Sequence, residues 1–128
     1  MTQPENPLPM RPYRLVFSVR DRDSNEVRLT ESQWRGHIIE KRPIMEPYLE
    51  EIRAVIHDPQ IIVADRSDDE VHFLTFGCVA NRPHLYPKVV VAYSNEVTGR
   101  RIGSVRTAFF TGRHPKGGII YEREPNRG

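Results

Sequence analysis

Four apolar runs follow one another after Pro59, with no helix-length segment between them. They read IIVA at 61–64, VHFLTFGCV at 71–79, KVVVAYS at 88–94 and IGSVRTAFFT at 102–111. β-Branched and aromatic residues, which favour strands, dominate these runs. The connecting segments are short and rich in turn-forming residues, whereas a parallel connection needs a long crossover. The second half of the chain therefore predicts an antiparallel meander of four strands.

The chain before Pro59 predicts a hairpin followed by two helices. The runs at 13–19 and 27–29 flank the polar sequence RDRDSNE, a pattern typical of a β-hairpin. Thr30 is a good N-cap, and Gln33 completes a capping-box pattern for a helix that ends before Pro43. A second helix is expected from 45–46 to Asp58, with these apolar residues at helical spacing: Met45, Tyr48, Leu49, Ile52, Val55 and Ile56.

These elements predict an α+β fold in one domain over 13–122. Residues 1–12 contain four prolines and few apolar residues, so we expect a flexible lead-in. Residues 123–128 form a tail. The run at 117–121 is either a last short strand or a clamp over the sheet.

Composition limits the class of protein. With 128 residues, the chain has room for one core. Its longest purely apolar run, Val89–Ala92, is far shorter than the ~20 residues that span a bilayer. Residues 1–12 contain no apolar stretch of a signal peptide, so we expect a soluble cytoplasmic protein without a membrane partner. Cys78 is the single cysteine, which excludes an internal disulfide.

The charges are unevenly distributed although their sum is only +2. Residues 46–70 contain eight acids and two bases, whereas residues 97–121 contain five bases and no acid. Most of the cations are arginines, whose planar guanidinium suits phosphate. A basic segment with aromatic neighbours favours nucleic-acid binding. Alternatively, the basic loops are solvated or face the acidic half of a second copy.

No metal or cofactor is expected. The five histidines do not pair at metal-ligand spacing, and there is no glycine-rich phosphate loop. The acids at 65–70 lack the spacing of a calcium loop. The remaining residues suit RNA cleavage without a metal, in which the 2′-hydroxyl attacks its own phosphodiester. Such an enzyme supplies a base, an acid and fixed positive charge.

His37 is the candidate general acid or base, because imidazole exchanges a proton near neutral pH. Helical spacing places Trp34, His37 and Lys41 on one face of the first helix, with Arg42 at its end. The alternative is a structural histidine that hydrogen-bonds to a neighbouring carbonyl.

Thr107 is the candidate on the last long strand. Alternation places Val105, Thr107 and Phe109 on one face and Arg106 on the other. The Thr107 hydroxyl needs a partner, which is either a phosphate or a cross-strand neighbour. Charge and position add the candidate RNA-binding residues Arg82, Lys88, Arg100, Arg101, Arg106, Arg113 and Tyr121. The alternative is that these polar side chains are solvated and bind nothing.

The run TESQWRGHIIEKRPIMEPYLEEI at 30–52 and the strand VRTAFFT at 105–111 resemble the barnase–EndoU–colicin–RelE-like nuclease domains of phages and bacteria. The resemblance covers about residues 27–122. It implies two helices packed on a four-stranded antiparallel sheet, here with an added N-terminal hairpin, and metal-independent RNase chemistry. By position, the resemblance assigns the site to His37, Arg42 and Thr107.

Three functions agree with these observations. The first is a small, possibly toxin-like ribonuclease that needs no metal and that an acidic inhibitor protein holds in check. The second is a non-catalytic domain that keeps the fold and binds RNA or a protein. The third is a toxin that cuts mRNA only on the ribosome, where the arginines matter more than any histidine.

Overall fold

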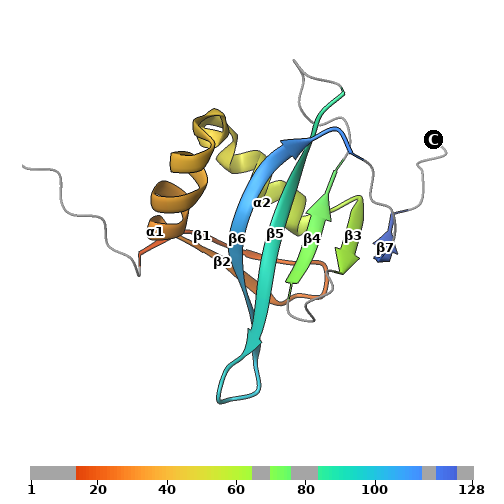
Figure 1. The fold of residues 1–128 in the computed structure, drawn as a ribbon. Coiled ribbons are helices and arrows are strands. Elements are labelled where there is room, and N and C mark those ends of the chain that lie inside the picture. Colours follow the sequence, from red (N-terminus) through yellow and green to blue (C-terminus); the bar gives the residue numbers. More distant parts are fainter. Residues whose placement is uncertain (1–13, 65–69, 76–83, 114–117, 124–128) are drawn as a thin grey trace, which may run out of the picture.

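The computed structural model describes residues 14–64, 70–75, 84–113 and 118–123. Figure 1 shows one curved sheet with the helices packed against it. The elements in chain order are β1 (Leu15–Arg20), β2 (Glu26–Thr30), α1 (Glu31–Gln33), the π-helical η1 (Trp34–Ile39), the 3₁₀-helical η2 (Pro43–Tyr48), α2 (Leu49–His57), β3 (Ile61–Ala64), β4 (Glu70–Leu74), β5 (Tyr86–Asn95), β6 (Arg101–Thr111) and β7 (Ile119–Glu122). The predicted α+β class is therefore confirmed.

The sheet has seven strands in the order β1-β2-β6-β5-β4-β3-β7. The predicted antiparallel meander is present as β3, β4, β5 and β6. The prediction of a four-stranded sheet is wrong in extent, because the hairpin and β7 join the same sheet. The hairpin joins through a parallel pairing of Glu26–Arg28 with Ile102–Ser104, and β7 pairs with β3.

The first helix begins where the sequence predicts. Thr30 caps it by accepting a hydrogen bond from the Gln33 backbone N–H at 3.3 Å. The second helix starts later than predicted, because Pro47 disfavours the α-helical backbone conformation at Glu46, the residue before it. The chain instead forms η2 from Pro43 to Tyr48, and α2 follows it.

The helices cover one face of the sheet, here called the inner face. Phe73 of β4 and Val89 and Val91 of β5 lie on this face and are at most 2% exposed. They form one core with Trp34 of η1 and Ile52 of α2. The opposite, outer face holds a smaller buried cluster of Ile61, Leu74 and Tyr86. Within the described residues, no helix is long and apolar enough to cross a membrane.

A buried carboxylate fixes the β1–β2 turn to the sheet. Asp21 is 7% exposed and accepts hydrogen bonds from the backbone N–H groups of Asp23 and Asn25. It also accepts one from the Tyr93 hydroxyl of β5 at 2.6 Å. Burial and this hydrogen bond raise the pKa of the Tyr93 hydroxyl well above its usual value. At the same turn, the Arg22 guanidinium lies 3.9 Å from the centre of the Tyr121 ring.

Candidate nucleic-acid interface

Two cations converge on the ring of Phe109 on the outer face. Phe109 of β6 lies opposite Lys88 of β5 in the strand register. The Lys88 Nζ lies 5.8 Å from the ring centre, and the Arg42 guanidinium approaches the same ring to 4.9 Å from the end of the first helix. Both distances are typical of cation–π contacts. The ring therefore brings together two positive charges that are far apart in the sequence.

Arg42 differs from most of the arginines that the structure describes, because no carboxylate of the described residues lies within salt-bridge distance of it. Eight other arginines have such a partner: Arg14, Arg22, Arg28, Arg35, Arg53, Arg100, Arg106 and Arg123. Arg42 is nevertheless half-buried. Its backbone N–H donates to the Ile38 carbonyl at 2.9 Å, which fixes the start of the side chain at the helix end. A half-buried guanidinium without a counter-charge favours an external anion.

Thr107 lies one outer-face position before Phe109 and pairs with Val90. Its hydroxyl oxygen is buried and has no hydrogen-bond partner among the described residues. Val90 in turn pairs with His72 of β4, so His72, Val90 and Thr107 form one row across three strands. At about 4.8 Å between neighbouring strands, the backbones of His72 and Thr107 lie roughly 10 Å apart. His72 has no predicted role, although the alternation in VHFL at 71–74 places its side chain on the opposite face of the strand from Phe73.

A β-bulge at Arg106 overturns part of the predicted alternation. Val91 pairs with Val105 and Val90 with Thr107, so Arg106 is an extra residue in β6. The bulge reverses the face on which later side chains lie. Val105 therefore packs in the inner core, whereas Thr107 and Phe109 share the outer face as predicted. The Arg106 side chain is 61% exposed, and its Nε lies 3.9 Å from Glu70 Oε2.

His37 lies on a helical segment that runs beside β6. The Gln33 side-chain amide donates to the Arg106 carbonyl, and Arg42 contacts Phe109 three residues further along the strand. These two contacts lie on either side of His37 in the sequence, so the helical turn that carries His37 lies beside β6 between Arg106 and Phe109. Its side chain is half-buried and makes no hydrogen bond or ion pair within the ranges that the structure describes.

The predicted shared face of Trp34, His37 and Lys41 is wrong. Trp34 is buried, His37 is half-buried and Lys41 is exposed. The reason is that residues 34–39 form π-helical turns, which are wider than the α-helical turns assumed from the spacing. Trp34 and Ile38 are consequently the two residues of η1 in the core.

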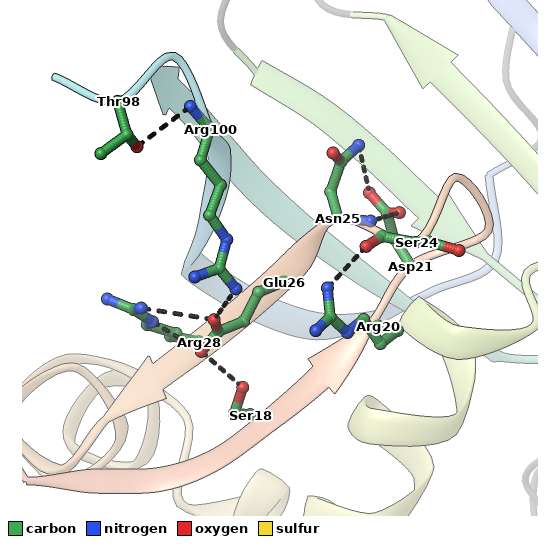
Figure 2. Close-up of polar contacts among 9 residues, drawn as sticks. All are labelled: Ser18, Arg20, Asp21, Ser24, Asn25, Glu26, Arg28, Thr98 and Arg100. Atoms are coloured by element: carbon green, nitrogen blue, oxygen red, sulfur yellow. Dashed lines mark hydrogen bonds and ion pairs between the residues drawn. The ribbon is translucent and has the colours of Figure 1, made fainter. Parts of the chain in front are cut away.

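The predicted cations Arg100 and Arg101 have partners at the other end of β6. Glu26 accepts hydrogen bonds from Ser18 at 2.8 Å, Arg28 at 2.7 Å and Arg100 at 2.6 Å. Figure 2 shows these three side chains around the Glu26 carboxylate. The hydrogen bonds from Arg28 and Ser18 hold the pKa of Glu26 at about 2 instead of 4.5. The Arg101 guanidinium lies 4.5 Å from the centre of the Tyr93 ring. These contacts connect β1, β2 and the β5–β6 turn.

The structure therefore brings Arg42, Lys88 and Thr107 together, and Arg106 lies next to them. Tyr121 lies on β7, where Arg22 covers its ring, and is not part of this group. Arg113 is exposed just after β6. Arg82 lies outside the described residues.

No family model, curated protein or solved structure matches the chain. Within the described residues, no group of three or more His, Cys, Asp or Glu side chains is placed to hold a metal ion. The grouping of polar and aromatic side chains that bears on function is the cluster of Arg42, Lys88, Thr107 and Phe109. This cluster is called the Phe109 site below.

Proposed function

We propose that the protein binds single-stranded RNA at the Phe109 site, where Arg42 and Lys88 hold a backbone phosphate. The observation that carries this proposal is the half-buried Arg42, which has no carboxylate partner among the described residues and lies with Lys88 on one aromatic ring. Arg is well suited to phosphate because its guanidinium donates two parallel hydrogen bonds. Thr107 lies on the same face one position before the ring, and its buried hydroxyl, which has no hydrogen-bond partner among the described residues, would donate to the phosphate only once it is exposed.

Binding is tested by the fluorescence anisotropy of a labelled single-stranded RNA of mixed sequence in buffer with EDTA. Arg42→Ala should weaken binding at least ten-fold. It should also reduce the slope of log affinity against log salt concentration by about one, because one phosphate contact is lost. Arg35→Ala is the matched control, since Arg35 lies on the same helix but pairs with Glu31 at 3.8 Å. Equal affinities of the two variants, or equal binding of single-stranded DNA, would contradict the proposal.

A second candidate function is metal-independent cleavage of the bound RNA, as the resemblance to the barnase–EndoU–colicin–RelE-like nucleases suggests. The position of His37 between the Gln33 and Arg42 contacts with β6 favours it. His37 would accept the proton of the 2′-hydroxyl as this oxygen attacks phosphorus, and water would protonate the leaving 5′-oxygen. Arg42 would stabilise the charge on the phosphoryl oxygens, and Thr107 would position the phosphate. The products are a 2′,3′-cyclic phosphate and a 5′-hydroxyl.

Cleavage is tested on the same RNA by gel analysis of its ends. Products with a 2′,3′-cyclic phosphate that form in EDTA and vanish in His37→Ala are expected. His57→Ala is the control, because His57 lies on α2 and contacts the Arg20 carbonyl instead. If the wild-type protein binds the RNA but does not cleave it, the proposal of RNA binding stands and the proposal of cleavage is wrong.

A further inference from the structure

A groove separates the edge of the sheet from helix α2, away from the Phe109 site. β1 is an outermost strand of the sheet, and Ser18, Val19 and Arg20 form one wall of the groove. Glu50, Arg53, Ala54 and His57, spaced along one face of α2, form the other wall. The groove has a volume of about 410 Å³. A strand edge beside a helix is a place where proteins add an extended peptide to a sheet.

The backbone of Ser18 points into this groove. The Asp21 N–H donates to the Asn25 carbonyl across the hairpin, so by alternation Val19 also faces β2, and Ser18 and Arg20 face outward. The contact of 3.0 Å between His57 Nδ1 and the Arg20 carbonyl agrees with this assignment. No hydrogen bond within the described residues uses the N–H and carbonyl of Ser18. Ser18 can therefore exchange two hydrogen bonds with one residue of an incoming strand.

The accessible part of the edge is short. The strand register shifts between Leu15 and Phe17, and a bulge of this kind ends regular pairing. At the other end, His57 already holds the Arg20 carbonyl. Because α2 forms the facing wall, the gap favours a single extended chain over the edge strand of a second folded copy.

The charges of the groove select the side chains of that chain. Arg20 and Arg53 line the groove together with one acid, Glu50, so the fixed charge of the walls is net positive. The Glu50 side chain is 80% exposed, and its Oε2 lies 3.9 Å from Arg53 Nη1. An exposed ion pair of this kind contributes little to stability, so Arg53 can exchange Glu50 for another acid. Acidic side chains at every second position lie on one face of an extended chain, and on the face towards α2 they would meet Arg53.

We propose that the groove between β1 and α2 binds an extended acidic peptide, which adds to the sheet as a strand beside Ser18. The surface is separate from the Phe109 site, so this proposal does not depend on RNA binding. The partner is defined by its chemistry, which is an exposed segment with acidic residues at every second position.

The probe is the capped peptide VEVEVEV, titrated into ¹⁵N-labelled full-length protein and followed by amide chemical shifts. We expect saturable shifts at Ser18, Val19 and Arg53, and slower amide exchange at Ser18. The capped peptide VKVKVKV should bind at least ten-fold more weakly. An absence of saturable shifts with VEVEVEV, or equal binding of the two peptides, would overturn the proposal.

Two substitutions of Ser18 separate backbone pairing from loss of the hydroxyl. Ser18→Pro removes the outward N–H, and proline is tolerated on an edge strand where that group faces solvent. Ser18→Ala removes the same contact with Glu26 but keeps the N–H. We expect Ser18→Pro to weaken peptide binding at least ten-fold, and Ser18→Ala to bind like the wild type. Equal affinities of the two variants would contradict strand addition.

Charge recognition and the rival occupant have their own controls. Arg53→Glu should weaken binding of VEVEVEV and strengthen binding of VKVKVKV. Arg35→Glu, which reverses an ion-paired arginine on the first helix, should change neither affinity. If sedimentation shows a dimer that Ser18→Pro abolishes, the occupant is a second copy of the chain and the proposal is wrong.

Discussion

The side-chain amide of Gln33 donates a hydrogen bond to the backbone carbonyl of Arg106, which joins the first turn of the helix to the bulge in β6. The backbone N–H of the same glutamine binds Thr30 Oγ1. A bulge interrupts the regular hydrogen bonding of a strand, and here a helix residue contacts one of its carbonyls. Gln33 therefore contributes both to the helix cap and to the position of the helix that holds His37 and Arg42.

Gln33→Ala should lower the free energy of unfolding by about 0.5–1.5 kcal/mol, the usual contribution of one hydrogen bond. Gln33→Glu should lower it at least as much at neutral pH, because an ionised carboxylate cannot donate to a carbonyl. Urea denaturation measures both. Arg35→Ala on the exposed side of the helix should change stability by less than about 0.5 kcal/mol. Equal stability of Gln33→Ala and Arg35→Ala would contradict this role.

Tyr93→Phe should lower the free energy of unfolding by about 1.5–3 kcal/mol, because it removes a donor to the buried carboxylate of Asp21. The remaining contact to the same oxygen, from Asn25 Nδ2, is 3.4 Å long. A double-mutant cycle of Tyr93→Phe with Asp21→Ala should give a coupling energy of about 1–3 kcal/mol. Additive effects of the two substitutions would show that the hydroxyl and the carboxylate act independently.

Glu26 should make the protein less stable in acid. Its pKa is about 2 in the folded protein against a usual value of 4.5, so the unfolded chain takes up the proton first as the pH falls. The stabilisation is present above pH 4.5 and is lost as the pH falls from 4.5 towards 2. With allowance for solvent around the arginines, we expect a loss of about 1 kcal/mol. The stability of Glu26→Gln, measured by thermal unfolding, should lack this part of the pH dependence. Identical pH profiles of the wild type and Glu26→Gln would refute this role of Glu26.

Thr107→Val should keep or raise the free energy of unfolding, by up to about 1 kcal/mol, because a buried hydroxyl without a partner is costly. The same variant should weaken RNA binding if the hydroxyl donates to a phosphate. Calorimetry and anisotropy on one preparation measure both effects. A loss of more than about 1 kcal/mol of stability would mean that the hydroxyl is partnered in the folded protein.

Local patterns predicted most of the elements because each depends on neighbouring residues. The run IIVA is β3 at its predicted bounds, and Thr30 is the N-cap. The period of two places Thr107 and Phe109 on one face because no bulge separates them. The pairing of strands that are distant in the sequence produces no local pattern of residues. Nothing in the sequence near Arg28 indicates that β2 runs parallel to β6.

The candidate site was predicted in part for the same reason. Arg42, Lys88 and Thr107 are polar residues that stand out in their segments, and the structure brings them together at Phe109. The extra residue at Arg106 and the π-turns around His37 change which side chains share a face. Both are insertions into a regular element, and a fixed period of 2 or 3.6 residues does not reveal them.

We expect the parallel contact between β2 and β6 to form late in folding. The five residues 96–100 join β5 to β6, and Gly99 among them has a φ of +85°, so this hairpin closes locally. Glu26 and Arg100, which connect β2 to that turn, are 74 residues apart, and long loops close late in folding. Val27→Ala, at a fully buried position of β2, should therefore accelerate unfolding in stopped-flow experiments and leave the refolding rate nearly unchanged. A mainly slower refolding rate would place the contact in the folding nucleus instead.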